Sequence, residues 1–154
     1  MTAQDRDELK QELLLDRQLC FALYGASLAL TRTYKPLLEP LGLTYPQYLT
    51  LMTLWETDHL TVKALGARLG LDSGTLSPLI KRLEQNGYVR RQRDGKDERQ
   101  VTVSLTQTGA ALKEKAVDVL MAIGNATGCS MVEIAALRDD LIALRDRLNE
   151  KHAL

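Results

Sequence analysis

Two cysteines are the side chains best suited to chemistry in this sequence of 154 residues. Cys20 lies in an apolar stretch, where a thiol ordinarily behaves as a small inert hydrophobe because apolar surroundings disfavour the thiolate. It could instead be reactive, provided that neighbouring groups donate hydrogen bonds to the thiolate. Phenol hydroxyls can do so, and four tyrosines lie in the same third of the chain: Tyr24, Tyr34, Tyr45 and Tyr48. The residues alone leave both interpretations of Cys20 open.

Cys129 is a candidate for the second thiol of a redox pair. A sulfenic acid formed at Cys20 can condense with another thiol to give a disulfide, which would make Cys129 a resolving cysteine. The alternative is an incidental thiol at Cys129, with oxidised Cys20 capped by a small-molecule thiol. Both cysteines are expected to be reduced at rest, because the sequence predicts a cytoplasmic protein.

The expected cytoplasmic localisation follows from two features. The longest uncharged apolar run, residues 19–31, is shorter than the roughly 20 residues that a membrane-spanning helix needs. The charged N-terminal segment is not followed by the hydrophobic core and cleavage site of a signal peptide. We therefore expect no membrane association.

The remaining chemistry-bearing residues form no recognisable site. His59 and His152 are isolated, and no group of histidines, cysteines and carboxylates has the spacing of metal ligands. The sequence also lacks a glycine-rich phosphate loop and a Ser/His/Asp arrangement. We expect no metal, no cofactor and no enzymatic activity. A thiol peroxidase that turns over hydroperoxide is the alternative from the enzyme class, but no peroxidase fold is recognisable.

The charge is balanced overall but uneven along the chain. Twenty basic and twenty acidic residues give a formal net charge of zero, which by itself argues against a nucleic-acid partner. Residues 61–100, however, contain nine basic and five acidic residues, an excess of four positive charges. A lone run of this kind is often only a solvated hairpin, so its neighbours decide its meaning. Five of the basic residues fall within ten positions: Arg90, Arg91, Arg93, Lys96 and Arg99.

The elements that would position these side chains are mainly α-helices. We expect a long helix from about Glu8 to Thr33, where no proline occurs, and a break at Pro36 and Pro40. Residues 19–30 are apolar on every side, so this helix needs to be buried all round. A partner subunit would provide such cover most easily.

Residues 44–85 have the pattern of a helix-turn-helix. Thr44 and Gln47 form a capping box that opens a helix, and two short helices are expected over 61–70 and 72–85 with a tight turn between them. The second would be the recognition helix, held to the domain by an apolar stripe. Its outward side chains suit a major groove and phosphates: Ser73, Thr75, Ser77, Lys81 and Arg82.

The hydrophobic period then changes from 3.6 to two residues, which predicts a hairpin. Strands are expected over 88–93 and 100–105, joined by a turn at Asp94–Gly95. Arginines such as Arg93 on this hairpin suit the negative potential of a DNA minor groove. A helix pair and a basic hairpin in this order predict a winged helix, and therefore a protein that binds double-stranded DNA.

Two further helices are expected after the hairpin, the first from Thr106 to about Ile123 and the second from Met131, with an interruption at Gly124 and Gly128. The fold class is therefore mainly α (α+β). The expected organisation is a single domain over residues 1–154, with a winged helix-turn-helix in 44–105 and dimerisation helices in 1–43 and 106–154.

The hairpin resembles the wing signature of the MarR family of dimeric bacterial transcription regulators. The resemblance is carried by Asp97-Glu98-Arg99, by the run from Val101 to Thr106 and by Gly109, and it extends over nearly the whole chain. It implies a homodimer on a double-stranded operator. It also implies that Arg99 enters the minor groove and that Asp97 holds Arg99 in place.

Two longer segments, LLLDRQLCFALYGASLAL and GLTYPQYLTLMTLWE, resemble the organic hydroperoxide regulators (OhrR), a branch of that family. The resemblance implies that Cys20 is the peroxidatic sensor and that Tyr34 and Tyr45 are its hydrogen-bonding phenols. In two-cysteine members a disulfide links the two subunits, which gives Cys129 the role of resolver. Cys129 lies about one helical turn after the position, near Asn125, where such relatives carry that cysteine.

The sequence thus predicts a redox-sensing repressor that binds its operator when reduced and releases it after an organic hydroperoxide oxidises Cys20. An apolar pocket around the thiol would favour organic peroxides over hydrogen peroxide. The alternative is a MarR-type repressor that responds to a non-covalent small phenolic effector, with Cys20 as part of the core.

Overall fold

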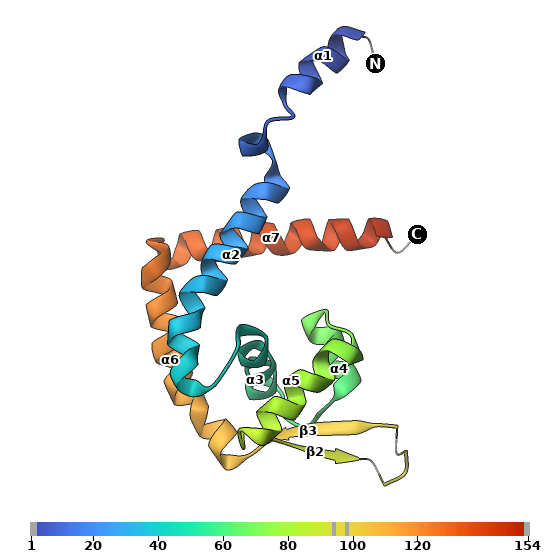
Figure 1. The fold of residues 1–154 in the computed structure, drawn as a ribbon, viewed down its shortest axis with the longest axis vertical. Helices are drawn as coiled ribbons and strands as arrows, with labels where there is room; N and C mark the ends of the chain where they lie inside the picture. The colour runs from blue at the N-terminus through green and yellow to red at the C-terminus, as the bar shows by residue number, and fades with distance from the viewer. Residues whose placement is uncertain (1–2, 94, 98, 153–154) are drawn as a thin grey trace. The chain divides into compact units, whose positions relative to one another are not determined.

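The computed structural model describes residues 3–93, 95–97 and 99–152 and is built mainly of helices with one small sheet (Figure 1). This agrees with the predicted mainly α (α+β) class. In chain order the elements are α1 (Ala3–Gln11), η1 (Leu15–Arg17), α2 (Leu19–Leu38), η2 (Glu39–Leu41), α3 (Tyr45–Glu56), β1 (Leu60–Thr61), α4 (Val62–Leu69), α5 (Ser73–Gln85), β2 (Val89–Arg93), β3 (Val101–Leu105), α6 (Gln107–Thr127) and α7 (Met131–His152).

Contacts divide the chain into two units, Met1–Ala111 and Leu112–Leu154. The first unit holds every element up to β3 together with the start of α6, and the second holds the rest of α6 and α7. The predicted grouping into a winged helix and dimerisation helices concerns an assembly of two chains, and it stays a prediction.

The N-terminal helix is divided, so the prediction of one helix from about Glu8 to Thr33 is wrong. The chain leaves α1 after Gln11, makes one turn of 3₁₀ helix, and begins α2 at Leu19. The Gln18 side chain explains the break, because its amide donates to the backbone carbonyls of Glu12 (2.7 Å) and Leu14 (3.1 Å). These two carbonyls, which follow the last residue of α1, thereby have hydrogen-bond partners without a continuing helix.

The expected break at Pro36 is also wrong, because α2 continues through Pro36 to Leu38. Pro36 removes one backbone donor near the end of the helix and lies at the surface, where water can solvate the freed carbonyl. The chain turns only after η2, at Gly42, whose positive φ of 66° is the left-handed conformation that glycine adopts without strain.

The helices α3, α4 and α5 enclose the core of the first unit. The capping box at Thr44 is present, with the Thr44 amide donating to Gln47 Oε1 at 2.9 Å, and it starts α3 as predicted. The core side chains are almost completely buried, and they come from all three helices and from the hairpin: Leu51, Leu54, Leu65, Leu76, Ile80, Leu83, Val89 and Val103.

The turn between α4 and α5 confirms the predicted helix-turn-helix. Gly70 ends α4 with a φ of 67°, and Asp72 caps α5 by accepting a hydrogen bond from the Thr75 amide at 2.8 Å. The turn also needs Gly66, because a Cβ there would lie 2.6 Å from the Leu71 carbonyl oxygen. The two short helices are therefore packed too closely for a larger side chain.

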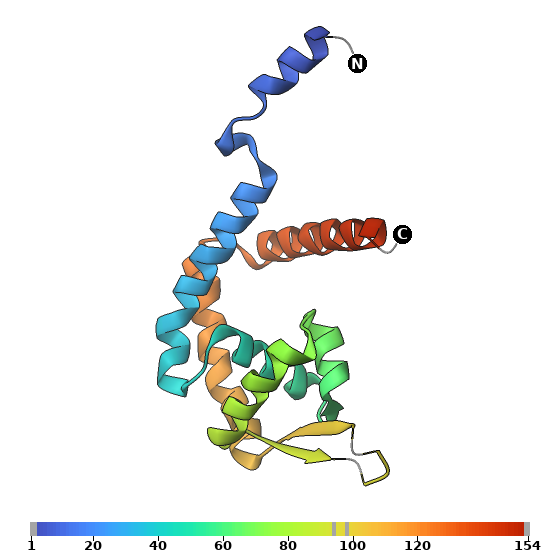
Figure 2. The ribbon, with the colours of Figure 1, turned by 45° about the vertical axis from the view of Figure 1, so that its right-hand side comes forward.

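The hairpin follows α5 as expected. The strands β2 and β3 pair antiparallel, with Arg91 opposite Val103, and Figures 1 and 2 both show the hairpin beside the C-terminal end of α5. The predicted turn residue Asp94 lies outside the described residues. A short strand that the sequence pattern did not indicate, β1, pairs with the other edge of β3 and gives the sheet the order β1-β3-β2.

The second unit consists of helix. The predicted interruption at Gly124 is wrong, because α6 continues to Thr127 and Gly124 lies within it. Gly128, with a φ of 67°, then ends the helix. Large apolar side chains of this unit are exposed in the single chain, among them Leu120, Met121, Leu137, Leu141 and Ile142.

Within the described residues, no single helix is long and apolar enough to cross a membrane, and one sharply bent pair, Gln107–Thr127 with Met131–Lys151, meets the length and composition criteria together. The same residues contain no group of three or more histidine, cysteine or carboxylate side chains placed to hold a metal ion.

Candidate functional site

Cys20 lies in the first turn of α2. The helix begins at Leu19 after Gln18, and its first backbone hydrogen bond runs from the Ala22 amide to the Gln18 carbonyl. The unpaired amides of a helix N-terminus carry partial positive charge and favour anions. Cys20 is exposed in the single chain, and so are its apolar sequence neighbours Leu19 and Phe21.

The predicted phenols Tyr34 and Tyr45 lie together. Their ring centroids are 4.7 Å apart, and the ring of Tyr48 lies 5.9 Å from that of Tyr34. Tyr48 in turn meets Trp55 edge-on at 6.0 Å, in the geometry that aromatic pairs prefer. The end of α2 and the start of α3 thus form one aromatic cluster.

The phenols of this cluster keep their protons at neutral pH. Burial, together with the nearby Tyr45 and Tyr48, raises the pKa of Tyr34 to about 12. Burial also raises the pKa of Tyr45 and of Tyr48. Protonated phenols are hydrogen-bond donors, which is the property that a thiolate partner requires.

The hydroxyls of Tyr34 and Tyr45 are available to a partner from outside. Neither hydroxyl makes a hydrogen bond within the part of the chain that the structure describes. In the same part, every buried side-chain polar atom has a hydrogen-bond partner. The two unbonded hydroxyl oxygens are therefore not buried and reach the surface of the single chain.

The structure does not bring Cys20 and Tyr34 together within one chain. Both residues belong to α2, which runs without interruption from Leu19 to Leu38. Fourteen residues of α-helix place them about 21 Å apart along the axis, which is too far for a hydrogen bond between their side chains. A thiol–phenol contact between these positions requires a second copy of the chain.

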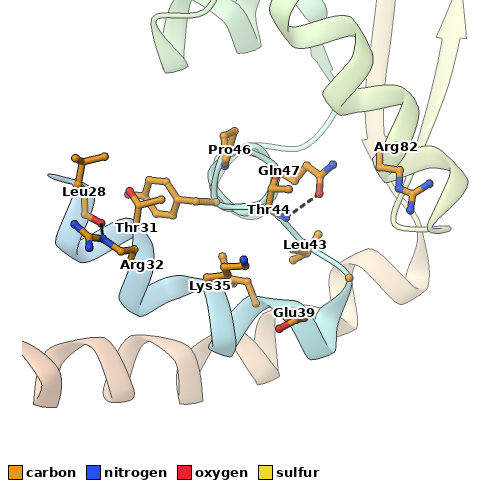
Figure 3. Close-up of a pocket in the computed structure, with 13 residues that line it drawn as sticks. Leu28, Thr31, Arg32, Lys35, Glu39, Leu43, Thr44, Pro46, Gln47 and Arg82 are labelled. Carbon is orange, nitrogen blue, oxygen red and sulfur yellow. Dashed lines mark hydrogen bonds between the residues drawn. The ribbon is translucent and has the colours of Figure 1, made fainter.

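An apolar cavity of about 580 Å³ lies beside Tyr45. Figure 3 shows Thr31 and Lys35 of α2 on one side, Thr44 and Gln47 at the start of α3, and Arg82 of α5 at the far end. Tyr45 also lines it. The cavity is therefore large enough for a small organic molecule, and its edge carries positive charge.

Cys129 lies in the connection between α6 and α7. It is exposed, its amide donates to Thr127 Oγ1 at 3.3 Å, and its thiol lies 3.5 Å from the Thr127 carbonyl oxygen. Ser130 and Glu133 then form a capping box for α7. The Ser130 amide and hydroxyl both donate to the Glu133 carboxylate, and these two hydrogen bonds lower its pKa. The thiol is thus held on a well-defined turn at the surface.

The predicted recognition helix presents its polar residues to the outside. Leu76, Ile80 and Leu83 are buried, whereas all five predicted DNA-contacting residues of α5 are exposed: Ser73, Thr75, Ser77, Lys81 and Arg82. The Thr75 hydroxyl donates to Asp72 Oδ2 at 2.9 Å, so its proton is engaged in capping the helix.

The wing residues Arg93, Asp97 and Arg99 are exposed as well. Asp97 holds Arg99 through the main chain, since its Oδ1 accepts a hydrogen bond from the Arg99 amide at 3.0 Å. Arg99 lines a cleft of about 620 Å³ together with Ser73 and Ser77. The wing and the recognition helix therefore share one surface, as a DNA-reading unit requires.

The recognition helix is also tied to the wing by residues that the sequence pattern did not single out. The Glu84 carboxylate accepts hydrogen bonds from the Arg91 guanidinium (2.8 Å) and from the Arg91 amide (3.0 Å). These bonds lower the pKa of Glu84. The sequence offered one signal for this contact: Glu84 lies on the last turn of α5, and the strand that follows, which contains Arg91, is basic.

A helix-turn-helix followed by a two-stranded wing, with polar and basic side chains on one exposed surface, defines the winged-helix class of DNA-binding regulators. Comparison with known proteins agrees. Residues 32–116 match the family model described as Transcriptional regulator SarA/Rot.

The chain is 49% identical over 138 residues to the organic hydroperoxide resistance transcriptional regulator of Bacillus subtilis, covering 90% of this chain and 94% of that protein. Reduced AbfR bound to DNA, a protein of Staphylococcus epidermidis, superposes with a TM-score of 0.75 at 35% identity, over 92% of this chain and 99% of that one. AbfR with a disulfide formed matches with a TM-score of 0.64 at 36% identity, over 93% and 98%. The chain therefore belongs to the MarR-type family of winged-helix transcriptional regulators, in the branch of the organic hydroperoxide resistance regulators.

Proposed function

We propose that this protein is a homodimeric transcriptional repressor of the cytoplasm, that it binds operator DNA when Cys20 is reduced, and that an organic hydroperoxide releases it by oxidising Cys20. It acts as a regulator rather than as an enzyme that turns over peroxide. The identity to a hydroperoxide resistance regulator supports the stimulus. The structural similarity to reduced, DNA-bound AbfR and to AbfR with a disulfide supports a reduced state that binds DNA and an oxidised state.

The observation that carries the proposal is the placement of the thiol and the phenols at opposite ends of α2. In a two-fold dimer, residue i of one chain meets residue j of the other, and j meets i. Two α2 helices packed antiparallel therefore place each Cys20 at the Tyr34–Tyr45 pair of the partner. Their exposed apolar faces would be buried in the same step.

The chemistry then follows from these groups. The Cys20 thiolate attacks the terminal oxygen of ROOH, the O–O bond breaks, and Cys20 becomes a sulfenic acid, oxidised by two electrons. The alkoxide that leaves takes a proton from water and departs as the alcohol ROH. The phenols of Tyr34 and Tyr45 donate hydrogen bonds to the thiolate and so hold it in place before the attack.

Cys129 acts as the resolving thiol. Its thiolate attacks the sulfenic sulfur of Cys20, the S–S bond forms, and hydroxide leaves and is protonated to water. The exposed position of Cys129 on the turn before α7 leaves its sulfur open to a partner. The new bond changes the relation of the dimer helices, and with it the spacing of the two recognition helices, on which binding to both operator half-sites depends.

In the DNA-bound state, α5 lies in the major groove and the wing lies against the minor groove. Ser73 and Ser77 face the bases, and Lys81 and Arg82 face phosphates. Arg93 and Arg99 of the wing add positive charge, and Asp97 fixes the backbone of Arg99.

A second candidate function is favoured by the cavity of about 580 Å³ beside Tyr45. A small phenolic effector bound there, near Lys35 and Arg82, would release DNA without any covalent change. In that case Cys20 has no part in the response.

Replacement of Cys20 by serine separates the two candidates. We expect the reduced Cys20→Ser protein to bind the operator like the wild type and to stay bound after treatment with cumene hydroperoxide, as measured by fluorescence anisotropy of labelled operator. Release of the Cys20→Ser protein by peroxide would contradict the proposal. Consumption of peroxide far beyond one equivalent per subunit would instead indicate a peroxidase.

A further inference from the structure

The end of the recognition helix is joined to the segment that carries the tyrosine pair. The Asn86 side-chain amide donates to the Gly42 carbonyl at 3.0 Å, and the Tyr88 hydroxyl donates to the Leu41 carbonyl at 2.7 Å. The partners are 44 and 47 residues apart in sequence. We call these two hydrogen bonds the α5 clamp.

Both donors of the α5 clamp are fixed to the end of α5. Asn86 is the C-cap of the helix, and its backbone amide donates to the Arg82 carbonyl at 3.0 Å. Gly87 has a φ of 77°, and the Tyr88 amide returns to the Leu83 carbonyl at 3.0 Å, which closes the helix end in the manner of a Schellman motif. A displacement of α5 therefore moves both donors with it.

The Tyr88 backbone is also restrained from the side of α6. Its carbonyl accepts a hydrogen bond from the Thr106 amide at 3.0 Å and lies so close to Gly109 that a Cβ there would come within 1.9 Å. Tyr88 thus has little freedom to absorb a movement of its partner.

Both acceptors of the α5 clamp lie in the short segment between the two phenols. At one end, Tyr34 is followed one helical turn later by the buried Leu38, the last residue of α2, and the acceptor Leu41 ends the 3₁₀ turn that comes next. At the other end, Gly42 is followed after two residues by Tyr45, the first residue of α3. Because a phenol bounds the segment on each side, a shift of either tyrosine displaces the two carbonyls.

We infer that Tyr88 and Asn86 are positioning residues that couple the Tyr34–Tyr45 pair to the recognition helix. The inference rests on the proposed function, since it requires that oxidation of Cys20 displace these phenols. The clamp converts a change at the phenols into a movement of α5. It makes the difference in operator affinity between the reduced and oxidised proteins larger than it is without these bonds.

The Tyr88→Phe variant tests this coupling, because it keeps the ring and removes the donor. Operator affinity is measured by fluorescence anisotropy on reduced protein and on protein whose Cys20 oxidation has been quantified by mass spectrometry. The readout is the ratio of the two affinities. We expect the ratio to shrink roughly three- to tenfold relative to the wild type, as the loss of one hydrogen bond allows. Asn86→Ala removes the other bond and should shrink the ratio in the same direction, which keeps the test open if Tyr88→Phe folds poorly.

Glu84→Gln is the matched control. It weakens the contact between α5 and Arg91 inside the reading unit, at the same end of the helix, but it leaves the α5 clamp intact. We expect it to lower operator affinity by the same factor in both states and to leave the ratio unchanged.

The outcomes separate the two ideas. An unchanged ratio for both Tyr88→Phe and Asn86→Ala, at equal Cys20 oxidation, overturns the coupling. If the affinity falls by the same factor in both states, the ratio is likewise unchanged, and the two side chains have a purely structural role. If the wild type keeps its operator although Cys20 is oxidised, the proposed function fails instead.

Discussion

Cys20 and Tyr34 lie on one face of the same uninterrupted helix, about four turns apart. Residues spaced by seven along an α-helix return to nearly the same side, so Ser27, midway between them, belongs to the same stripe. If each Cys20 meets the partner's Tyr34, the two-fold axis of the dimer must pass close to Ser27.

This geometry predicts a crosslink at Ser27. In a background of Cys20→Ser and Cys129→Ser, the Ser27→Cys protein should form a covalent dimer on mild oxidation, visible by non-reducing gel electrophoresis. A disulfide needs Cα atoms within roughly 7 Å, which positions at a two-fold axis can satisfy. Ala29→Cys in the same background faces the opposite side of α2 and serves as control. Crosslinking at Ala29 but not at Ser27 would contradict the antiparallel arrangement.

Tyr34 should titrate unusually late. Its pKa is raised to about 12 in the folded protein, so its phenolate should form at higher pH than that of an ordinary tyrosine, as seen in the near-ultraviolet absorbance of tyrosinate. Between the ordinary tyrosine pKa of about 10 and the raised pKa of about 12, Tyr34 is ionised in the unfolded chain but protonated in the native protein, so the unfolded chain binds fewer protons. The free energy of unfolding is therefore expected to fall from about pH 10 to about pH 12. Because the pKa values of Tyr45 and Tyr48 are raised as well, Tyr34→Phe should remove one tyrosine's share of the late absorbance change. An unchanged titration would refute the assignment.

Cys129→Ser should abolish a covalent dimer. After mild treatment with an organic hydroperoxide, the wild type is expected to run as a disulfide-linked dimer on a non-reducing gel, and the variant as a monomer with Cys20 oxidised. Cys20→Ser is the control and should also run as a monomer. If the oxidised wild type gives monomers alone, an intersubunit disulfide is refuted and capping by a small thiol becomes the explanation.

Arg99→Ala should weaken operator binding on the order of tenfold and reduce its salt dependence, because one cationic contact to DNA is lost. Asp97→Asn is a milder change, since the asparagine oxygen can still accept from the Arg99 amide. We expect it to retain most of the affinity. Unchanged binding of Arg99→Ala at physiological salt would remove Arg99 from the DNA interface.

Local signals predicted most of the DNA-reading unit. The capping box at Thr44, the two short helices predicted over 61–70 and 72–85 and the change of hydrophobic period at β2 each depend on residues close together in sequence. The structure has these elements where they were expected. The exposed faces of α5 and the wing followed from the same periodicity.

Other features depend on contacts that no local pattern reports. The break before α2 comes from the Gln18 side chain reaching two carbonyls, and glutamine carries no general breaking tendency. The helix passes Pro36 because it lies near the end, at the surface. The bonds from Asn86 and Tyr88 join positions more than 40 residues apart, so neither periodicity nor spacing could have indicated them.

The indole of Trp55 donates to the Gly109 carbonyl at 2.9 Å, and Trp55 is the single tryptophan of the chain. Its ring also meets Tyr48, the neighbour of the phenol pair. The protein thereby contains a built-in optical reporter at the place where the reading unit passes into α6. Rapid-mixing fluorescence could follow, in unlabelled protein and without DNA, how long after peroxide is added this junction rearranges.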